Sequence, residues 1–153
     1  MSNLEDLYRE IILDHYRNPR NRGELATPPA HKAEGFNPLC GDEITVFLQV
    51  EGDTLVDIKI AGHGCSISQS SASLMTAAVK GKPLETVRGT IDTFKQLMTV
   101  HETSLDAEVE PEPVNLRALG ELAALQGVVK FPVRIKCAVL AWNTLTQGLN
   151  DLA

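Results

Sequence analysis

The spacing of apolar residues changes along the chain and predicts which segments are helices and which are strands. Residues 3 to 17 carry apolar side chains at helical spacing, which predicts an amphipathic helix that ends at Asn18-Pro19. From residue 43 to residue 60 the apolar period becomes two, and Gly52-Asp53 interrupts the run. This pattern predicts a β-hairpin, and the preceding segment "HKAEGFN" is a candidate third strand.

After the hairpin the apolar spacing is again helical. Residues 102 to 113 hold five acids and two prolines but no base, which is typical of an exposed connection. Helices packed around one short antiparallel sheet of about three strands make α+β the expected fold class. The predicted helices cover residues 66 to 79, 84 to 100, 115 to 125, and a last segment that follows Pro132 and reaches Leu149.

Composition and charge narrow the functional classes. With 153 residues and 43% apolar content, the chain is long enough to form one domain over residues 1–153 with its own core. Its net charge of −6 argues against nucleic acid as a partner, because phosphate binding needs clustered lysine and arginine. No run reaches the ~18 apolar residues of a membrane span, and the charged N-terminus is unlike a signal peptide. We therefore expect a cytoplasmic protein that does not bind membranes.

Three cysteines supply the candidate chemistry. Cys40 lies in the turn "NPLCGDE", two residues before Asp42; Cys65 directly precedes the helix predicted from residue 66, and Cys137 lies in the first turns of the last helix. Three thiolates and one carboxylate match the four-ligand preference of Zn²⁺. Free cysteine is also among the most buried residue types, so inert core thiols are the alternative. Spacing alone leaves both interpretations open.

Four segments of the chain carry a family resemblance: "DHYRNPRNRG" (14–23), "NPLCGDE" (37–43), "GHGCSISQSSASLM" (62–75) and "FPVRIKCA" (131–138). Together they resemble the U-type iron–sulfur scaffold proteins, and they occur in the order found in that family. The resemblance runs from the first predicted helix to the last. It implies an α+β fold in which a metal or cluster is bound by Cys40, Asp42, Cys65 and Cys137.

Two departures separate the branches of this family. In the IscU-like branch a histidine precedes the last cysteine and a Leu-Pro-Pro-Val-Lys motif lies before it, whereas this chain has Lys136 and the segment "FPVRI". The interval from Cys65 to Cys137 is also long. Both features are similar to the SufU branch, whose members bind zinc and accept sulfur from a cysteine desulfurase.

The resemblance implies a zinc-dependent sulfur transfer protein of iron–sulfur cluster biogenesis. Cys40 would be the catalytic residue that takes persulfide sulfur from a SufS-like cysteine desulfurase, and downstream iron–sulfur assembly proteins would receive it. Such a role is sulfurtransferase-like, and whether it makes the protein an enzyme stays open. The alternatives are a scaffold that assembles a 2Fe–2S cluster on the same ligands and passes it to apo-proteins, and a purely structural zinc module.

Two residues close to the cysteines in the sequence can each be interpreted in two ways. Arg134, one helical turn before Cys137, either hydrogen-bonds a metal-binding thiolate or Asp42, or is a solvated residue at a helix start. His63 is either a further ligand or, as we favour, a surface histidine.

Two more groups of residues are also ambiguous. Arg17, Arg20 and Arg22 are either cations at a helix C-terminus or a docking patch for the desulfurase, which the resemblance favours. The serines between residues 66 and 73 indicate close helix packing rather than phosphate binding, because no P-loop lysine pattern follows them.

Overall fold

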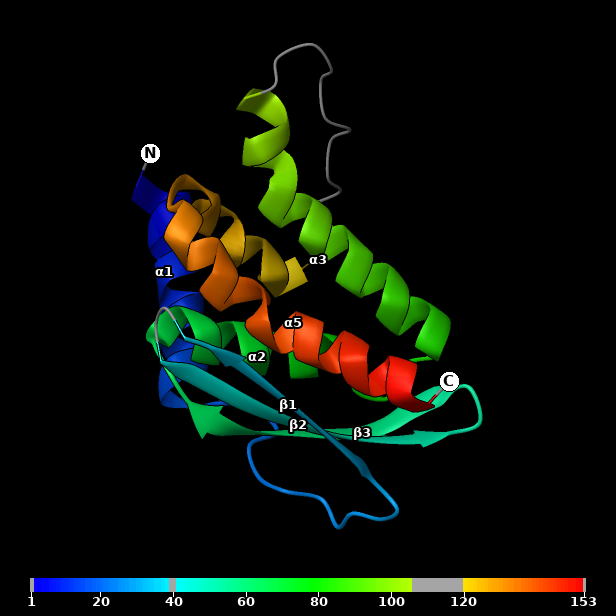
Figure 1. Cartoon of the computed structure of the whole chain (residues 1–153). Coiled ribbons are helices and arrows are strands. Elements are labelled where there is room, and N and C mark those ends of the chain that lie inside the picture. Colours follow the sequence, from blue (N-terminus) through cyan, green and yellow to red (C-terminus); the bar gives the residue numbers. More distant parts are fainter. Residues whose placement is uncertain (1, 39–40, 106–119, 153) are drawn as a thin grey trace.

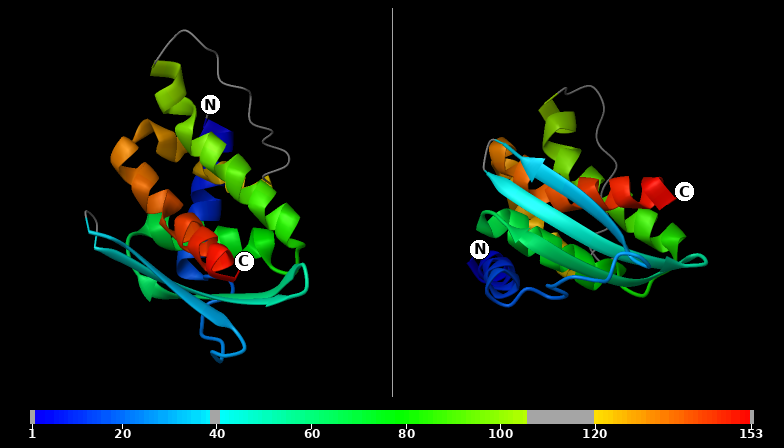
Figure 2. Two further views of the ribbon diagram at one scale, coloured as in Figure 1. Left: turned by 45° about the vertical axis from the view of Figure 1, so that its right-hand side comes forward. Right: turned by 60° about the horizontal axis from the view of Figure 1, so that its bottom comes forward.

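The computed structural model describes residues 2–38, 41–105 and 120–152. Its three strands form an antiparallel sheet in the order β1-β2-β3, and the helices gather on one face of this sheet, as Figures 1 and 2 show. The expected α+β class is therefore confirmed. The elements are α1 (Ser2–Arg17), β1 (His31–Asn37), β2 (Asp42–Glu51), β3 (Thr54–His63), α2 (Ser66–Val79), α3 (Leu84–Leu105), the 3₁₀ helix η1 (Gly120–Lys130) and α5 (Pro132–Leu152).

The sheet forms where the two-residue apolar period predicted it. On β2 the alternate residues Ile44, Val46 and Leu48 are buried in the core. The hairpin turn contains Gly52, whose φ of 59° lies in the left-handed region that glycine adopts at little cost. "HKAEGFN" forms β1, which confirms the candidate third strand, and its last residue pairs with the first residue of β2.

Helix α5 lies directly against the sheet because two glycines leave room for it. A Cβ atom at Gly148 of α5 would lie 2.7 Å from Leu48 Cδ2, and one at Gly35 of β1 would overlap Thr144 Oγ1. On its other side α5 carries Trp142, whose ring stacks on Phe94 of α3 with centroids 4.2 Å apart. The fully buried Trp142 thus joins the long helix α3 to the rest of the core.

The connection between α1 and β1 is ordered by the sheet and runs below it in Figure 1. The backbone of Asn21 accepts a hydrogen bond from the Ile60 N–H, and the Gly23 N–H donates to the Ile60 carbonyl, both at 2.9 Å. This segment therefore pairs with β3 just before the strand reaches Cys65.

Two predicted helix boundaries were wrong. Helix α3 continues to Leu105, so residues 102 to 105 are helical rather than part of the acidic connection; no glycine or proline interrupts the sequence there. The helix predicted over 115 to 125 is instead η1, which ends at Lys130 and contains Gly127. Burial of the neighbouring Leu125 and Val128 in the core outweighs the low helix propensity of that glycine. Residues 106–119 lie outside the described part of the chain.

The last helix has the predicted position and begins with a proline. Pro132 is the first residue of α5, a position where the missing N–H would have had no intrahelical partner. None of the helices in the described ranges is long and apolar enough to cross a membrane.

Candidate metal centre

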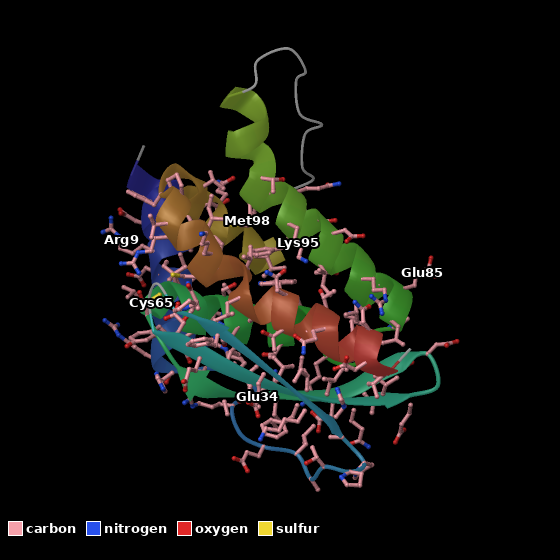
Figure 3. The ribbon with its side chains drawn as sticks, viewed as in Figure 1. Arg9, Glu34, Cys65, Glu85, Lys95 and Met98 are labelled. Carbon is pink, nitrogen blue, oxygen red and sulfur yellow. The ribbon has the colours of Figure 1, made fainter. Side chains whose placement is uncertain are left out.

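Three of the four predicted ligands meet at one end of the sheet. Asp42 is the first residue of β2, Cys65 directly precedes α2, and Cys137 lies in the second turn of α5. Their ligand atoms all lie within 4.8 Å of one another. Asp42 and Cys137 are fully buried and Cys65 is half-buried. Figure 3 shows the Cys65 sulfur at the end of the sheet next to α2.

Cys65 is held by the start of helix α2. Its backbone is extended, with φ −70° and ψ 168°, and its sulfur accepts a hydrogen bond from the Ser68 N–H at 3.5 Å. The sequence predicted this placement.

The two carboxylate oxygens of Asp42 have different surroundings. Oδ1 accepts a hydrogen bond of 2.9 Å from the Cys65 N–H, whereas Oδ2 lies 3.9 Å from the Cys65 sulfur. One oxygen thus fixes the side chain to the backbone and the other faces the thiols. Asp42 is a more rigidly held group than its place in a surface turn suggested.

Gly64 makes this approach of Asp42 to Cys65 sterically feasible. A Cβ atom at Gly64 would lie 2.5 Å from Asp42 Oδ1 and 2.5 Å from Ser68 Oγ. The sequence itself gave no signal that a carboxylate packs against Gly64.

Cys137 is surrounded by hydrogen-bond donors. Asn37 Nδ2 donates to its sulfur at 3.8 Å, and Asn37 lies opposite Asp42 in the β1–β2 pairing. The pKa of Arg134 is raised above its usual value, first by the electrostatic interaction with Cys65 and then by a hydrogen bond to Cys137. Of the two interpretations of Arg134, the structure supports the one in which it faces the thiols. Sequence reasoning missed Asn37, although it lies within the "NPLCGDE" motif.

The donor set fits a zinc ion. Bonds of about 2.3 Å to sulfur and about 2.0–2.2 Å to oxygen in a tetrahedron place neighbouring ligand atoms roughly 3.3–3.8 Å apart. The 3.9 Å between Asp42 Oδ2 and the Cys65 sulfur is close to that spacing, and the 4.8 Å limit for the group requires only small movements. Cys40, the remaining predicted ligand, lies outside the described residues.

The His63 side chain is turned toward solvent. It is 72% exposed, and its Nε2 lies 3.1 Å from a carboxylate oxygen of Glu43 on the neighbouring strand. His63 does not belong to the group formed by Asp42, Cys65 and Cys137. This position agrees with the surface interpretation.

Two of the three predicted docking arginines make internal contacts. Arg22 donates to the Gly62 carbonyl at 2.8 Å and to the Gln69 side chain at 3.3 Å. It therefore links β3 to α2, the two elements on either side of Cys65. Arg20 pairs with Asp14. Both arginines nevertheless lie at the surface, since Arg22 is exposed and the Arg20 side chain is 40% exposed, so these contacts leave the docking interpretation a prediction.

His15 is a further residue of the first motif that sequence reasoning missed. It is 1% exposed, its Nδ1 lies 2.7 Å from Ser73 Oγ of α2, and its Nε2 lies 3.2 Å from Glu121 of η1. These contacts join α1 to α2, the helix that Cys65 caps, and to η1. The amphipathic pattern of the first helix predicts that its polar residues face solvent. It therefore could not show that this histidine is buried.

The comparisons with known proteins agree on one family. The family model for the NifU-like N-terminal domain matches residues 7–152. The zinc-dependent sulfurtransferase SufU of Bacillus subtilis strain 168 is 44% identical over 148 residues, which cover 97% of this chain and 92% of that protein. The iron–sulfur cluster assembly scaffold protein IscU of Streptococcus pyogenes serotype M1 is 38% identical over 153 residues, covering 100% and 89%.

A solved structure shows the same architecture. The crystal structure of a proposed iron–sulfur cluster assembly scaffold protein for the SUF system, from Fervidobacterium islandicum AW-1, matches with a TM-score of 0.76 and 30% identity. The match covers 92% of this chain and 94% of that one. The likeness therefore extends over nearly the whole fold described above.

Proposed function

Because the chain belongs to the NifU-like N-terminal domain family, we propose that it is a zinc-dependent sulfur transfer protein of iron–sulfur cluster biogenesis, acting in the cytoplasm. The observation that carries the proposal is the convergence of Asp42, Cys65 and Cys137 from three separate elements onto one point. The 44% identity to a zinc-dependent sulfurtransferase favours zinc as the ion.

Asp42, Cys65 and Cys137 would hold the ion together with Cys40. Cys40 stands two positions before Asp42 in the sequence, and two residues of chain span at most about 7 Å, so the fourth thiol is within reach of the site. Zn²⁺ would supply a redox-inert Lewis acid that keeps the bound thiols deprotonated.

Three of the proposed ligands are held in place by the fold. Asp42 is anchored through Oδ1, the Cys65 sulfur accepts from the α2 N-terminus, and Cys137 is buried on α5. In the sequence, Cys40 stands between Asn37, the last residue of β1, and Asp42, the first residue of β2. We therefore assign Cys40 as the sulfur acceptor and the other three residues as permanent ligands.

The transfer step is a thiol–disulfide exchange. The Cys40 thiolate attacks the terminal sulfur of a cysteine persulfide on a SufS-like desulfurase. A new S–S bond forms at Cys40, the S–S bond of the donor breaks, and the donor cysteine leaves as a thiolate, so no external oxidant is needed. Downstream assembly proteins would then receive the sulfur from Cys40.

Mass spectrometry after incubation with a cysteine desulfurase and cysteine tests this assignment. We expect an added sulfur on Cys40 in the wild type, and a Cys40→Ala variant that folds but neither carries the added sulfur nor stimulates the desulfurase. Leu39→Ala, which changes the residue next to Cys40 in the sequence and keeps every thiol, is the matched control and should retain both properties. Wild-type stimulation by Cys40→Ala would disprove the assignment.

A second candidate is assembly of a 2Fe–2S cluster on the same ligands, because the chain is also 38% identical to an IscU scaffold. The absorption spectrum of anaerobically purified protein separates the two functions. Iron–thiolate sites absorb visible light, whereas Zn²⁺ is d¹⁰ and colourless. A colourless protein containing stoichiometric zinc supports sulfur transfer, and a brown protein containing iron supports the scaffold.

A further inference from the structure

Ser71 of helix α2 makes two hydrogen bonds to helix α5. Its hydroxyl donates to the Ala138 carbonyl at 2.6 Å and accepts from the Trp142 Nε1–H at 2.9 Å. Ser71, Ala138 and Trp142 are all fully buried, so water cannot replace either bond. One side chain of α2 is thus fixed to two successive turns of α5.

These bonds lie between the two helices that carry thiols. Cys65 caps the start of α2, six residues and about 9 Å of helix before Ser71. Cys137 is the immediate neighbour of Ala138, the residue whose carbonyl accepts the Ser71 bond. Any sliding or rotation of α5 against α2 at this point therefore changes the distance between the Cys65 and Cys137 sulfurs.

The two hydrogen bonds of Ser71 are well suited to fix the position of α5 along α2. The donor to Ser71 is an indole whose ring also stacks on Phe94, so Trp142 cannot turn away without losing a second contact. The carbonyl at the other end belongs to the helix backbone and moves only with α5. Metal–ligand bonds keep their lengths within about 0.2 Å, so the helices that carry the thiols must be held in a defined relative position.

We propose that Ser71 is a positioning residue of the metal site, which sets the separation of the Cys65 and Cys137 thiolates by fixing α5 against α2. The inference rests on the proposed function, since it concerns the same ligands. The sequence indicated only close helix packing for the serines of this segment, and the inference gives one of them a specific role.

Ser70 provides a matched control on the same helix. It is also fully buried, but its hydroxyl donates to Ile67 O, a carbonyl of its own helix, at 3.3 Å. Ser70→Ala and Ser71→Ala therefore remove the same atom from the same helix, and the second substitution alone breaks the connection to α5.

The test is the zinc affinity of the folded metal-free protein, measured by competition with a chromophoric chelator under reducing conditions, with circular dichroism to confirm folding. Ser71→Ala should weaken zinc binding about tenfold, at the low end of the effects seen when groups that orient metal ligands are removed. Ser70→Ala should stay within about twofold of the wild type. The visible bands of bound Co²⁺ should lose tetrahedral intensity only in Ser71→Ala.

A purely structural role gives a different result. It would lower the melting temperature of the metal-free Ser71→Ala variant while leaving the zinc affinity of its folded state equal to that of Ser70→Ala, and this outcome overturns the inference. If Ser71→Ala does not fold, Trp142→Phe takes its place, because it keeps a ring against Phe94 and removes the N–H donor. An unchanged zinc affinity of Trp142→Phe would also overturn the inference. Failure of the wild type to bind zinc overturns the proposed function itself.

Discussion

Gly64→Ala is the substitution that most directly tests the geometry of the metal centre. The new methyl carbon would lie 2.5 Å from both Asp42 Oδ1 and Ser68 Oγ, about 1 Å inside the usual contact distance of ~3.5 Å. No positive φ is required at this residue, so the effect comes from lost space rather than from backbone strain. Relief requires the Asp42 carboxylate to move away from the Cys65 N–H.

The expected loss follows from two contributions. Overpacking a buried site costs about 1–3 kcal/mol, and breaking the charged hydrogen bond to the Cys65 N–H costs about 1.5–3 kcal/mol. Movement of the carboxylate relieves part of the overpacking but breaks the hydrogen bond, so the two costs do not add in full. The free energy of unfolding of the metal-free protein should therefore fall by about 2–4 kcal/mol. Zinc affinity should fall roughly 10–100-fold, since the second carboxylate oxygen turns with the first.

Urea unfolding of the metal-free protein and zinc competition together measure both effects. Gly89→Ala is the control: it lies in helix α3 with no atom within 4 Å of a new Cβ, and its substitution should be neutral or stabilise the fold by up to about 1 kcal/mol. If Gly64→Ala matched this control in stability and in zinc affinity, the close contact between Asp42 and the Gly64 turn would not exist in solution.

Three further predictions concern the fold and its metal. Gly35→Ala should lower the free energy of unfolding by about 1–3 kcal/mol, because the new methyl group overlaps Thr144 Oγ1. Adding Thr144→Ala should restore part of the lost stability, and a double variant no more stable than Gly35→Ala would contradict the contact. The pKa of Asp14 is lowered from 3.8, chiefly by its hydrogen bond to Arg20, so its contribution to stability is complete above the unfolded-state pKa and is lost as the pH falls through the lower folded-state pKa. Asp14→Asn should thus be less stable than the wild type at pH about 7 in urea titrations, and the difference should vanish in strong acid; a difference independent of pH would refute the linkage. Removal of zinc by a chelator should lower the melting temperature, because the ion binds the folded state selectively, and an unchanged melting temperature would count against a bound structural ion.

The sequence predicted features that depend on local pattern. The two-residue period placed Ile44, Val46 and Leu48 on the buried face of β2, and the predicted bounds of α2 agree with the structure. Cys65 was expected at a helix start because glycine and then a serine-rich helical segment surround it. These features were predictable because the pattern of neighbouring residues favours the same backbone conformation that the fold adopts there.

Features that depend on tertiary packing were not predictable. Whether Asp42 and Cys137 share a site is decided by the way α5 lies on the sheet, and only the resemblance to a family suggested it. The contacts of Asn37 and His15 also join segments distant in sequence. The prediction for η1 was wrong for a related reason, since burial of Leu125 and Val128 outweighed the breaker signal of Gly127.

The position of Cys137 in the last helix also has a consequence for the biosynthesis of the protein. Chains emerge from the ribosome N-terminus first, so Asp42 and Cys65 are available well before α5 has been made. A nascent or truncated chain that ends before residue 137 lacks one of the three converging ligands, together with the helix that closes over the other two. The three candidate ligands can therefore come together only after residue 137 has been synthesised and α5 has begun to form.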